Sequence, residues 1–451
     1  MKRKTFIKSS SAALAGSYLL PWLSACKSQP MNSLNWAGNY TYKAKRRLTP
    51  DSVDELTELV RKERAAKALG TRHCFNDIAD SPVSQISTAN LNRIRDLDAS
   101  RLTVTVESGI KYGQLCPYLE ERGYALHNLA SLPHISVGGA VATATHGSGI
   151  KNGNLSSAVR AMELVNASGE VVPISPDSQP EAFYGGVVGL GGLGIVSALT
   201  LCIQKSFRMQ QRVYQYLPLQ SLKENFLPIL SAGYSVSLFT DWMKQEVSQV
   251  WVKSVYDPMN TGITDFYGAK PATKNLHPIE ALDAVNCTEQ LGEAGTWYDR
   301  MPHFKMGFTP SSGEELQAEY FVPLENGLDA LLALEKKKEL IYPLLQISEI
   351  RTIDADPFWI SPCSDKPSLA IHFTLKPDWP SVQKLLPVIE AELAPFGAKP
   401  HWGKLFTLDA GTLQSRYEKM GDFVHLLRTF DPEGKFRNHF LDTFIYSFEH
   451  K

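Results

Sequence analysis

Several signatures that would identify an enzyme class directly are missing from this chain of 451 residues. It has no H-x-x-x-H or C-x-x-C pair with the spacing of zinc ligands, and no G-x-S-x-G segment of the kind that carries a nucleophilic serine. Lys and Arg total 46 against 47 Asp and Glu, so no excess of positive charge indicates nucleic-acid binding. Low-complexity tracts, long runs of like charge and repeats of fixed period are also missing. With 43% hydrophobic residues, the chain is expected to bury a sizeable core.

A long apolar run is missing too, but the first 26 residues, MKRKTFIKSSSAALAGSYLLPWLSAC, predict an export signal. Lys2, Arg3 and Lys4 form a basic start, and the apolar stretch at 12–23 is too short to span a bilayer. The segment ends in LSAC, which resembles a bacterial lipoprotein processing site with Cys26 as the lipidated residue. The prediction is an exported protein of the periplasm or cell envelope, anchored at Cys26. A disordered tail with a chance cysteine is the alternative, and the export route stays open.

Cysteine is scarce in the rest of the chain, with Cys74, Cys116, Cys202, Cys287 and Cys363 widely spaced. The odd number and the large expected core argue against a disulfide scaffold. We therefore expect buried free thiols and no structural metal site.

Hydrophobic periodicity predicts a two-domain α+β protein. The N-terminal part alternates helices with strands: a helix within 49–65, a strand at 67–70, a strand within 101–109, a helix at 111–123 and a hairpin over 158–174 that turns at ASGE. From residue 206 onward, strands that alternate apolar and polar residues are interleaved with helices, which indicates a second sheet domain.

Two segments rich in small residues indicate close approach of the backbone to a partner. SVGGAVATATHGSG at 136–149 would let backbone N–H groups face an anion such as a pyrophosphate, although a structural loop has the same composition. GLGGLG at 189–194 matches G-x-G-x-x-G, but a strand-like IVSALTLCI follows where a dinucleotide fingerprint requires a helix. We therefore interpret it as a glycine turn, either between packed strands or against a cofactor held in some other way.

A small set of polar residues lies in strand-like surroundings of the second domain. Glu349 and Arg351 are two apart in ISEIRTI and share a face with Ile347 and Ile353, so they could line a pocket or form a surface ion pair. In LAIHFTL, His372 points away from Ile371 and Phe373, and it could be structural or catalytic. Lys404 in HWGKLF lies among aromatic residues, which indicates an interior position.

Four stretches resemble one known family: GTRHCFNDIADS, ALHNLASLPHISVGGAVATATHGSG, VVGLGGLGIVSALTL and DPEGKFRNHFL. They are similar to the vanillyl-alcohol-oxidase-type flavoproteins, and among them to the alditol oxidases. The resemblance implies an α+β fold with a two-subdomain FAD-binding domain at 35–205, a cap domain at 206–409 and a C-terminal return to the FAD-binding domain at 410–451. It implies that a ring nitrogen of His73 carries the 8α carbon of FAD covalently. It also implies flavin contacts from a set of residues: Ala68, Leu69, Gly70, Thr71, Arg72, Cys74, Ser131, Ser136, Gly139, Thr143, Ala144, Thr145, His146 and Ile195.

For the substrate side, the resemblance implies contacts from Ser131, Glu349, Arg351, Thr374 and Lys404. It implies a terminal alcohol of a linear polyol that loses hydride to the flavin while His372 accepts the hydroxyl proton. Arg351 and Lys404 would stabilise the developing alkoxide, and Glu349 and Ser131 would position neighbouring hydroxyls. O2 would then be reduced to hydrogen peroxide.

Alternatives to that interpretation stay open at this point. Lys404 could be the base, and the acceptor could be a quinone or a cytochrome. The chain could be a sugar-lactone oxidase or dehydrogenase of the same family. It could also be a lipid-anchored sugar-binding or scaffold protein without turnover. The choice of polyol and the oligomeric state do not follow from the sequence.

Overall fold

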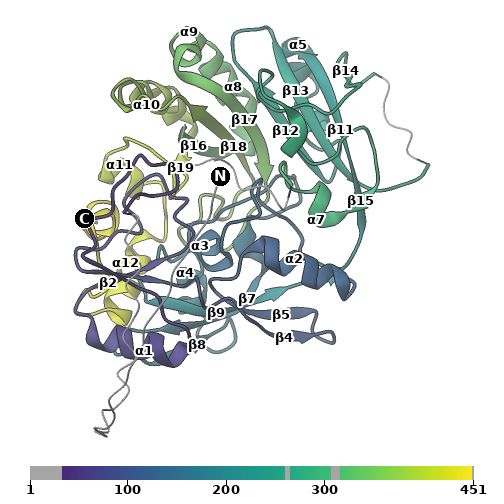
Figure 1. Ribbon diagram of the computed structural model, residues 1–451. Helices are drawn as coiled ribbons and strands as arrows, with labels where there is room; N and C mark the ends of the chain where they lie inside the picture. The colour runs from purple at the N-terminus through teal and green to yellow at the C-terminus, as the bar shows by residue number, and fades with distance from the viewer. Residues whose placement is uncertain (1–32, 260–264, 306–314, 449–451) are drawn as a thin grey trace, which may run out of the picture.

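Two groups of β-sheets make up the computed structural model, which describes residues 33–259, 265–305 and 315–448 (Figure 1). The predicted export signal and Cys26 lie outside the described residues. Within them, no helix is both long enough and apolar enough to cross a membrane. The mixture of helices with parallel and antiparallel sheets confirms the predicted α+β class.

The lower half in Figure 1 contains the N-terminal sheets. A three-stranded parallel sheet has the order β1-β3-β2. A five-stranded antiparallel sheet has the order β4-β5-β9-β7-β8, and β6 pairs with β10. The bounds of these strands are Arg46–Leu48 (β1), Ala66–Leu69 (β2), Ser84–Ser87 (β3), Ile94–Asp98 (β4), Thr103–Glu107 (β5), Tyr124–Ala125 (β6), Val159–Val165 (β7), Val171–Ile174 (β8), Ile195–Cys202 (β9) and Gln204–Lys205 (β10).

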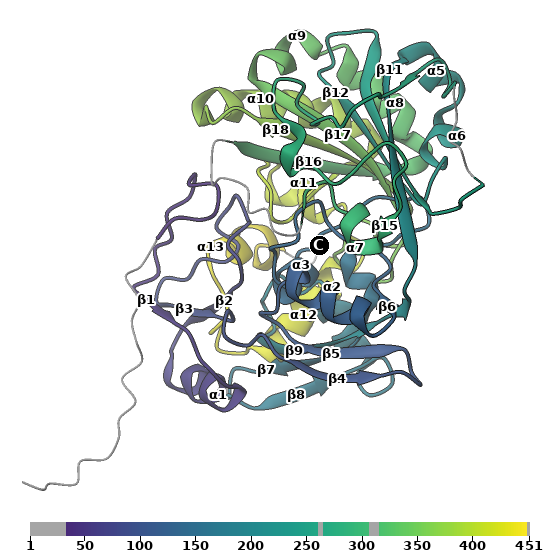
Figure 2. The same cartoon turned by 45° about the vertical axis from the view of Figure 1, so that its right-hand side comes forward.

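The upper half is a nine-stranded antiparallel sheet in the described part of the chain, with the order β14-β11-β13-β12-β17-β18-β16-β19 and with β15 beside β11. Its strands are Arg208–Pro218 (β11), Ser235–Thr240 (β12), Glu246–Val255 (β13), Lys270–Pro271 (β14), Gly295–Thr296 (β15), Leu316–Pro323 (β16), Leu345–Ile353 (β17), Ser368–Leu375 (β18) and Lys399–Pro400 (β19). Figure 2 shows α8 and α10 on the side of this sheet that faces away from the lower half. The other side of the sheet is therefore turned toward the lower half.

The helices divide between the two halves. In the lower half lie Val53–Lys62 (α1), Tyr112–Glu121 (α2), Val137–Ala142 (α3), Pro180–Gly186 (α4), Ala410–Gln414 (α11), Met420–Phe430 (α12) and His439–Leu441 (α13). With the upper sheet lie Leu219–Glu224 (α5), Phe226–Leu230 (α6), Trp297–Arg300 (α7), Gly327–Glu335 (α8), Lys338–Ile341 (α9) and Trp379–Leu393 (α10).

Local sequence explains why several of these elements begin and end where they do. The Ser52 hydroxyl accepts a hydrogen bond of 3.2 Å from the backbone N–H of Glu55 and so caps α1, the helix predicted within 49–65. The β7–β8 hairpin also forms as predicted, and β9 directly follows the GLGGLG turn. At the end of that turn Gly194 has φ of 156°, and a Cβ there would lie 2.5 Å from the carbonyl oxygen of Val165. Only glycine fits this conformation and this approach to β7.

Each half has its own hydrophobic core. The lower core includes Leu115, Leu199 and, from the C-terminal helices, Phe423 and Phe440. The upper core lies between the sheet and α8 with α10, and it contains Ile371 and Phe373 of β18. The C-terminal segment thus returns to the lower half, where the carbonyl oxygen of Lys435 accepts a 2.9 Å hydrogen bond from the N–H of Ala66. The domain boundaries at 205/206 and 409/410 stay a prediction.

The cysteines of the described residues are unpaired. Cys116, Cys287 and Cys363 are buried, as expected. The expectation of burial was wrong for Cys74 and Cys202, which are half-buried. Cys74 lines the cavity between the halves, and Cys202 lies at the end of β9.

Candidate active site

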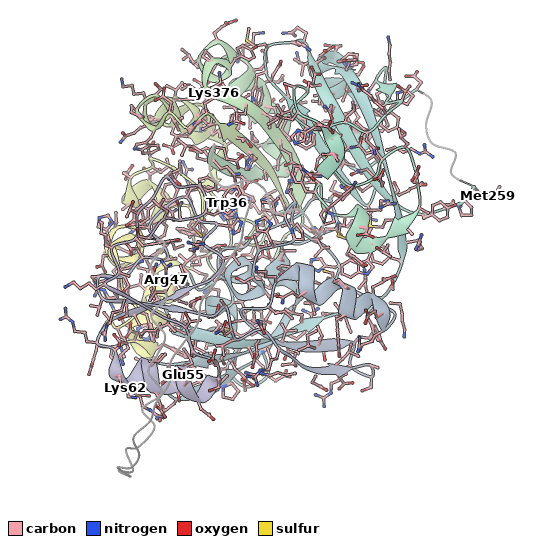
Figure 3. All side chains as sticks on the ribbon, in the orientation of Figure 1. Trp36, Arg47, Glu55, Lys62, Met259 and Lys376 are labelled. Carbon is pink, nitrogen blue, oxygen red and sulfur yellow. The ribbon has the colours of Figure 1, made fainter. Side chains whose placement is uncertain are left out.

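A cavity of about 600 Å³ lies between the lower half and the inner face of the upper sheet. Figure 3 places Trp36, one of its wall residues, between the two halves. This volume is within the range of cofactor and substrate sites. Most of the predicted site residues line it: Ala68, Leu69, Gly70, Thr71, Arg72, His73, Cys74, Ser131, Gly139, Thr143, Thr145, His146, Glu349, Arg351, His372, Thr374 and Lys404.

Three predicted residues do not line the cavity but lie just behind its wall. Ser136 is buried, and its N–H donates to the Thr71 hydroxyl over 3.3 Å. Ala144 is buried with a positive φ of 54°. Ile195 belongs to the small core formed with α1 and β2, although its neighbours Gly194 and Val196 line the cavity. Ser136 thus contacts Thr71 of the lining, and Ala144 and Ile195 are flanked in sequence by lining residues.

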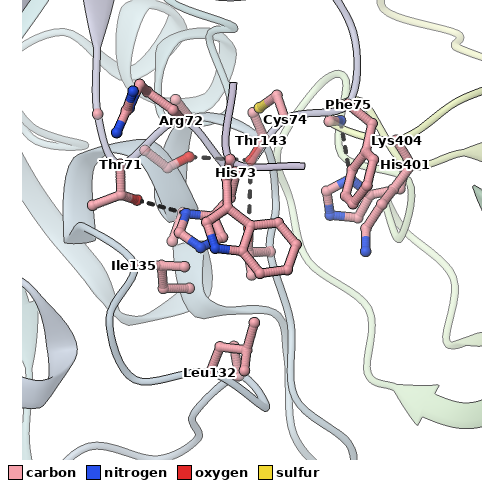
Figure 4. Close-up of a pocket in the computed structure, with 18 of the residues that line it drawn as sticks. Thr71, Arg72, His73, Cys74, Phe75, Leu132, Ile135, Thr143, His401 and Lys404 are labelled. Atoms are coloured by element: carbon pink, nitrogen blue, oxygen red, sulfur yellow. Dashed lines mark hydrogen bonds between the residues drawn. The ribbon is translucent and has the colours of Figure 1, made fainter. Parts of the chain in front are cut away.

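His73 follows β2 and lines the cavity, and Figure 4 shows its side chain beside that of Thr71. Its Nδ1 is 3.1 Å from the Thr71 hydroxyl, and its Nε2 is 2.6 Å from Nε2 of His134. The Trp36 ring stacks on it with centroids 5.0 Å apart. Burial, together with His134 and Lys404, lowers the pKa of His73 to about 3, and burial lowers that of His134 to about 4. At neutral pH both rings are uncharged, and one nitrogen of the close pair carries the shared proton.

The segments near one end of the cavity are suited to a phosphate-bearing cofactor. A Cβ on Gly70 would lie 2.7 Å from the Ser136 hydroxyl, and one on Gly138 would lie 2.8 Å from Cβ of Ser108. The buried hydroxyls of Ser108 and Ser136 have no hydrogen-bond partner among the described residues. The glycines let these two serines pack closely beside the cavity, and their unsatisfied hydroxyls fit an anionic dinucleotide such as FAD.

Lys67 also lies in the wall of the cavity, a position that no sequence pattern predicted. Its ammonium group donates to the carbonyl oxygens of Gly191 at 3.0 Å and Phe436 at 3.2 Å. Burial lowers the pKa of Lys67 to about 7, against the opposing effect of Asp431. The side chain ties β2 to the glycine turn and to the C-terminal segment.

On the upper sheet, Glu349 and Arg351 form a pair that is buried beside the cavity, so the surface ion pair is excluded. The Arg351 guanidinium donates to both carboxylate oxygens of Glu349 and to the Ser131 hydroxyl. His303 lies 2.7 Å from the same carboxylate through its Nε2. Burial alone would raise the pKa of Glu349, but Arg351 and His303 hold it well below its usual range. The cluster thus holds the Arg351 cation in place at the cavity through its pairing with the Glu349 carboxylate.

His372 is the cross-strand neighbour of Glu349, because β17 and β18 pair in that register. Its Nε2 is 3.1 Å from the Thr374 hydroxyl. Burial and the nearby Lys404 lower the pKa of His372, which leaves the ring as a neutral base. Lys404 donates to the Gln317 side chain, and burial lowers its pKa. Figure 4 shows Lys404 and His401 on a different segment from His73.

The structure adds residues that the sequence analysis missed, among them Trp36, Lys67, His134, His303 and Glu319. Of these residues, Glu319 could have been found from the sequence, because it is a charged residue in the mostly apolar strand segment LQAEYFVP. Trp36 and His134 lie outside the regular strands and helices and follow no period. Their place beside His73 depends on tertiary contacts.

Comparison with known proteins supports a flavin-binding role for this cavity. The profile of the family described as "FAD binding domain" matches residues 44–175, and that of "D-arabinono-1,4-lactone oxidase" matches residues 311–444. An alditol oxidase from a Streptomyces species is 43% identical over 411 residues, which cover 90% of this chain and 97% of that protein. An L-gulono-1,4-lactone dehydrogenase of Mycobacterium tuberculosis is 27% identical over 90% of this chain and 96% of its own length.

Among solved structures, a cholesterol oxidase from B. sterolicum superposes with a TM-score of 0.74. It covers 91% of this chain and 96% of its own, at 15% sequence identity. A solvent-stable cholesterol oxidase gives a TM-score of 0.73 at 17% identity and covers 92% of this chain and 99% of its own. At these identities the likeness establishes the fold.

Proposed function

Because this chain belongs to the vanillyl-alcohol-oxidase-type FAD-linked oxidases, in the branch of the alditol oxidases, we propose that it oxidises a terminal primary alcohol of a linear polyol. The substrate class is the alditols, such as xylitol and sorbitol, and the products are an aldose and hydrogen peroxide from O2. One observation carries the proposal: a buried cation and a neutral imidazole, Arg351 and His372, line the same cavity as the His73 segment.

FAD is the cofactor, and when bound it supplies the hydride acceptor. Residues 68–74 and the small-residue segment around Gly138 and Gly139 would hold it, with Ser108 and Ser136 as hydroxyl partners. Lys67 would hold the glycine turn in place through its hydrogen bond to Gly191. These roles follow from which residues line the cavity and which of their polar atoms lack partners.

We propose that His73 is bonded to the 8α carbon of the flavin. A ring nitrogen must be neutral to form this bond, and the lowered pKa of His73 supplies that state at neutral pH. When the nitrogen–carbon bond forms, the ring N–H proton leaves. Replacing a C–H bond of the methyl group by this bond is a two-electron oxidation; the C–H proton would leave to solvent, and the flavin and then O2 would take up the two electrons. His134, in contact with His73 Nε2, is placed to receive the proton.

In the proposed oxidation, the chain's own residues position the alcohol and remove its hydroxyl proton. His372 accepts the proton at Nε2, next to Thr374. Arg351 and Lys404 stabilise the negative charge that develops on the oxygen. Glu349 and Ser131, both bonded to Arg351, contact the neighbouring hydroxyls and orient the chain of the polyol.

A lactone substrate is the second candidate, because the D-arabinono-1,4-lactone oxidase profile matches residues 311–444. Oxygen uptake with xylitol and sorbitol, compared with gulono- and arabinono-lactones, separates the two. We expect kcat/KM for the better alditol to exceed that for any lactone by about 100-fold or more. A lactone would leave some of the fixed donors and acceptors of the site without a hydrogen-bond partner, which weakens its binding in the transition state. Faster oxidation of a lactone would contradict the assignment. Turnover with a quinone but none with O2 would contradict the oxidase reaction.

We also propose that the protein is exported and anchored by a lipid on Cys26. The support is the basic start, the short apolar run and the LSAC sequence. Expressed in a bacterium, the full-length protein is expected in the membrane fraction, and the Cys26→Ala variant in the soluble fraction. A Cys26→Ala protein that stays with the membranes would contradict the anchor.

A further inference from the structure

Glu319 is a buried carboxylate that the proposed mechanism leaves without a role. It lies on β16, directly across from His372 on β18, and only 4% of its surface is exposed. Its Oε1 is 3.6 Å from Nδ1 of His372 and 3.2 Å from Nε2 of His146. The carboxylate thus lies between a histidine of the upper sheet and a histidine of the small-residue segment below it.

The carboxylate is ionised in these surroundings. Burial alone would raise the pKa of Glu319, but His146 and His372 hold it well below its usual range. The charged and titratable groups around Glu319 and His372 come from three segments: His146 of the small-residue segment, Glu349 and Arg351 of β17, and His401 and Lys404 after β19. An unpaired carboxylate would be costly at this depth, so its charge is balanced by these cations and imidazoles.

The two nitrogens of His372 therefore have different partners. The negative charge of Glu319 lies 3.6 Å from Nδ1, so its electrostatic attraction favours the ring form with the proton on Nδ1. In that form Nε2 keeps its lone pair and accepts from the Thr374 hydroxyl, 3.1 Å away. This is the ring form in which Nε2 can take a proton from an alcohol in the cavity.

We propose that Glu319 is a positioning residue for His372, which fixes the Nδ1–H form of the ring and stabilises the imidazolium formed when Nε2 accepts the substrate's hydroxyl proton. This inference rests on the proposed function. The alcohol O–H bond breaks and its proton goes to His372, while the hydride from the adjacent carbon goes to the flavin. Glu319 itself gains and loses no proton, and it acts on the reaction through the His372 ring.

The test is Glu319→Gln, which keeps the size of the side chain and removes its charge. Reduction of the bound flavin by xylitol without oxygen is expected to slow by about 100-fold or more, with KM little changed. Glu319 opposes the effect of burial on His372, so its loss lowers the pKa of His372, and the acid limb of the pH profile moves to lower pH. Because His372→Gln already lacks the base, adding Glu319→Gln to it is expected to slow reduction no further.

A second readout does not depend on turnover. In protein carrying histidine labelled with ¹³C at Cε1, the signal of His372 is assigned by its loss in His372→Gln. Its pKa is expected to fall by about 1 to 3 in Glu319→Gln, the effect of one removed charge at this separation. The variant Glu319→Asp, which keeps the charge, is expected to titrate as the wild type does.

Glu390 provides the matched control. It is also a buried glutamate, held by the Tyr320 hydroxyl at 2.8 Å and the N–H of Thr407 at 2.6 Å, away from His372. Glu390→Gln is expected to leave the pH profile and the His372 signal in place. If Glu319→Gln loses flavin or stability while His372 titrates as in the wild type, the role is structural and the inference is overturned. If alditols do not bleach the wild type at all, the proposed function fails, and the inference fails with it whatever the NMR signal shows.

Discussion

The Arg351→Met variant is expected to reduce its flavin with an alditol about 10²- to 10³-fold more slowly than the wild type, the usual cost of one lost charge-stabilising donor. The Arg351 guanidinium donates hydrogen bonds both to the carboxylate of Glu349 and to the Ser131 hydroxyl. Methionine keeps much of the length and none of the donors. The measurement is stopped-flow bleaching of the flavin band without oxygen, at saturating and limiting alditol.

Arg351→Met is also expected to be less stable, by about 3 to 5 kcal/mol, because it leaves the buried Glu349 carboxylate without its guanidinium partner. The double variant Glu349→Leu, Arg351→Met removes both charges and is the control. It is expected to regain most of the lost stability and none of the lost activity. Wild-type reduction rates in Arg351→Met would contradict the role of the guanidinium.

The second large effect is expected from His73→Ala. The wild type is expected to keep its yellow colour in the protein pellet after acid precipitation, and His73→Ala to release all of it. The physical reason is that an alanine side chain has no nitrogen to hold the 8α carbon, whereas cavity contacts are lost on denaturation. Flavin absorbance of the pellet and the mass of the intact chain measure the outcome.

His277 offers a control for the loss of a cavity histidine. It lines the cavity on the upper side and is half-buried, away from the 70–74 segment. His277→Ala is expected to retain its flavin in the pellet. Flavin retained by denatured His73→Ala would show that another residue carries the bond, or that it forms without this histidine.

Some of the site follows from strand periodicity alone. Glu349 and Arg351 are two residues apart, so a β-strand places them on one face, and the structure confirms that this face borders the cavity. For the same reason His372 points away from Ile371 and Phe373, which lie in the upper core. The glycine turn at 189–194 is followed by a strand, as the β-branched residues of the following segment predicted.

Other parts of the site depend on contacts that periodicity cannot supply. Glu319 and His372 meet because β16 pairs with β18 in one register, which a single sequence does not specify. His303 reaches Glu349 from outside the regular strands, and His134 reaches His73 from a segment 61 residues away. The burial of Cys202 was predicted wrongly because half-buried positions at strand ends have no clear sequence signal.

One measurement tests the central claim most directly: the visible spectrum of the purified protein without oxygen, before and after xylitol or sorbitol is added. We predict an absorption band at about 450 nm, which is typical of oxidised flavins. The band is expected to bleach when the alditol is added and to return when air is admitted. A yellow protein whose band is unchanged by alditols and bleached by a sugar lactone would contradict the alditol assignment. A colourless protein would contradict the account of the cavity as a flavin site.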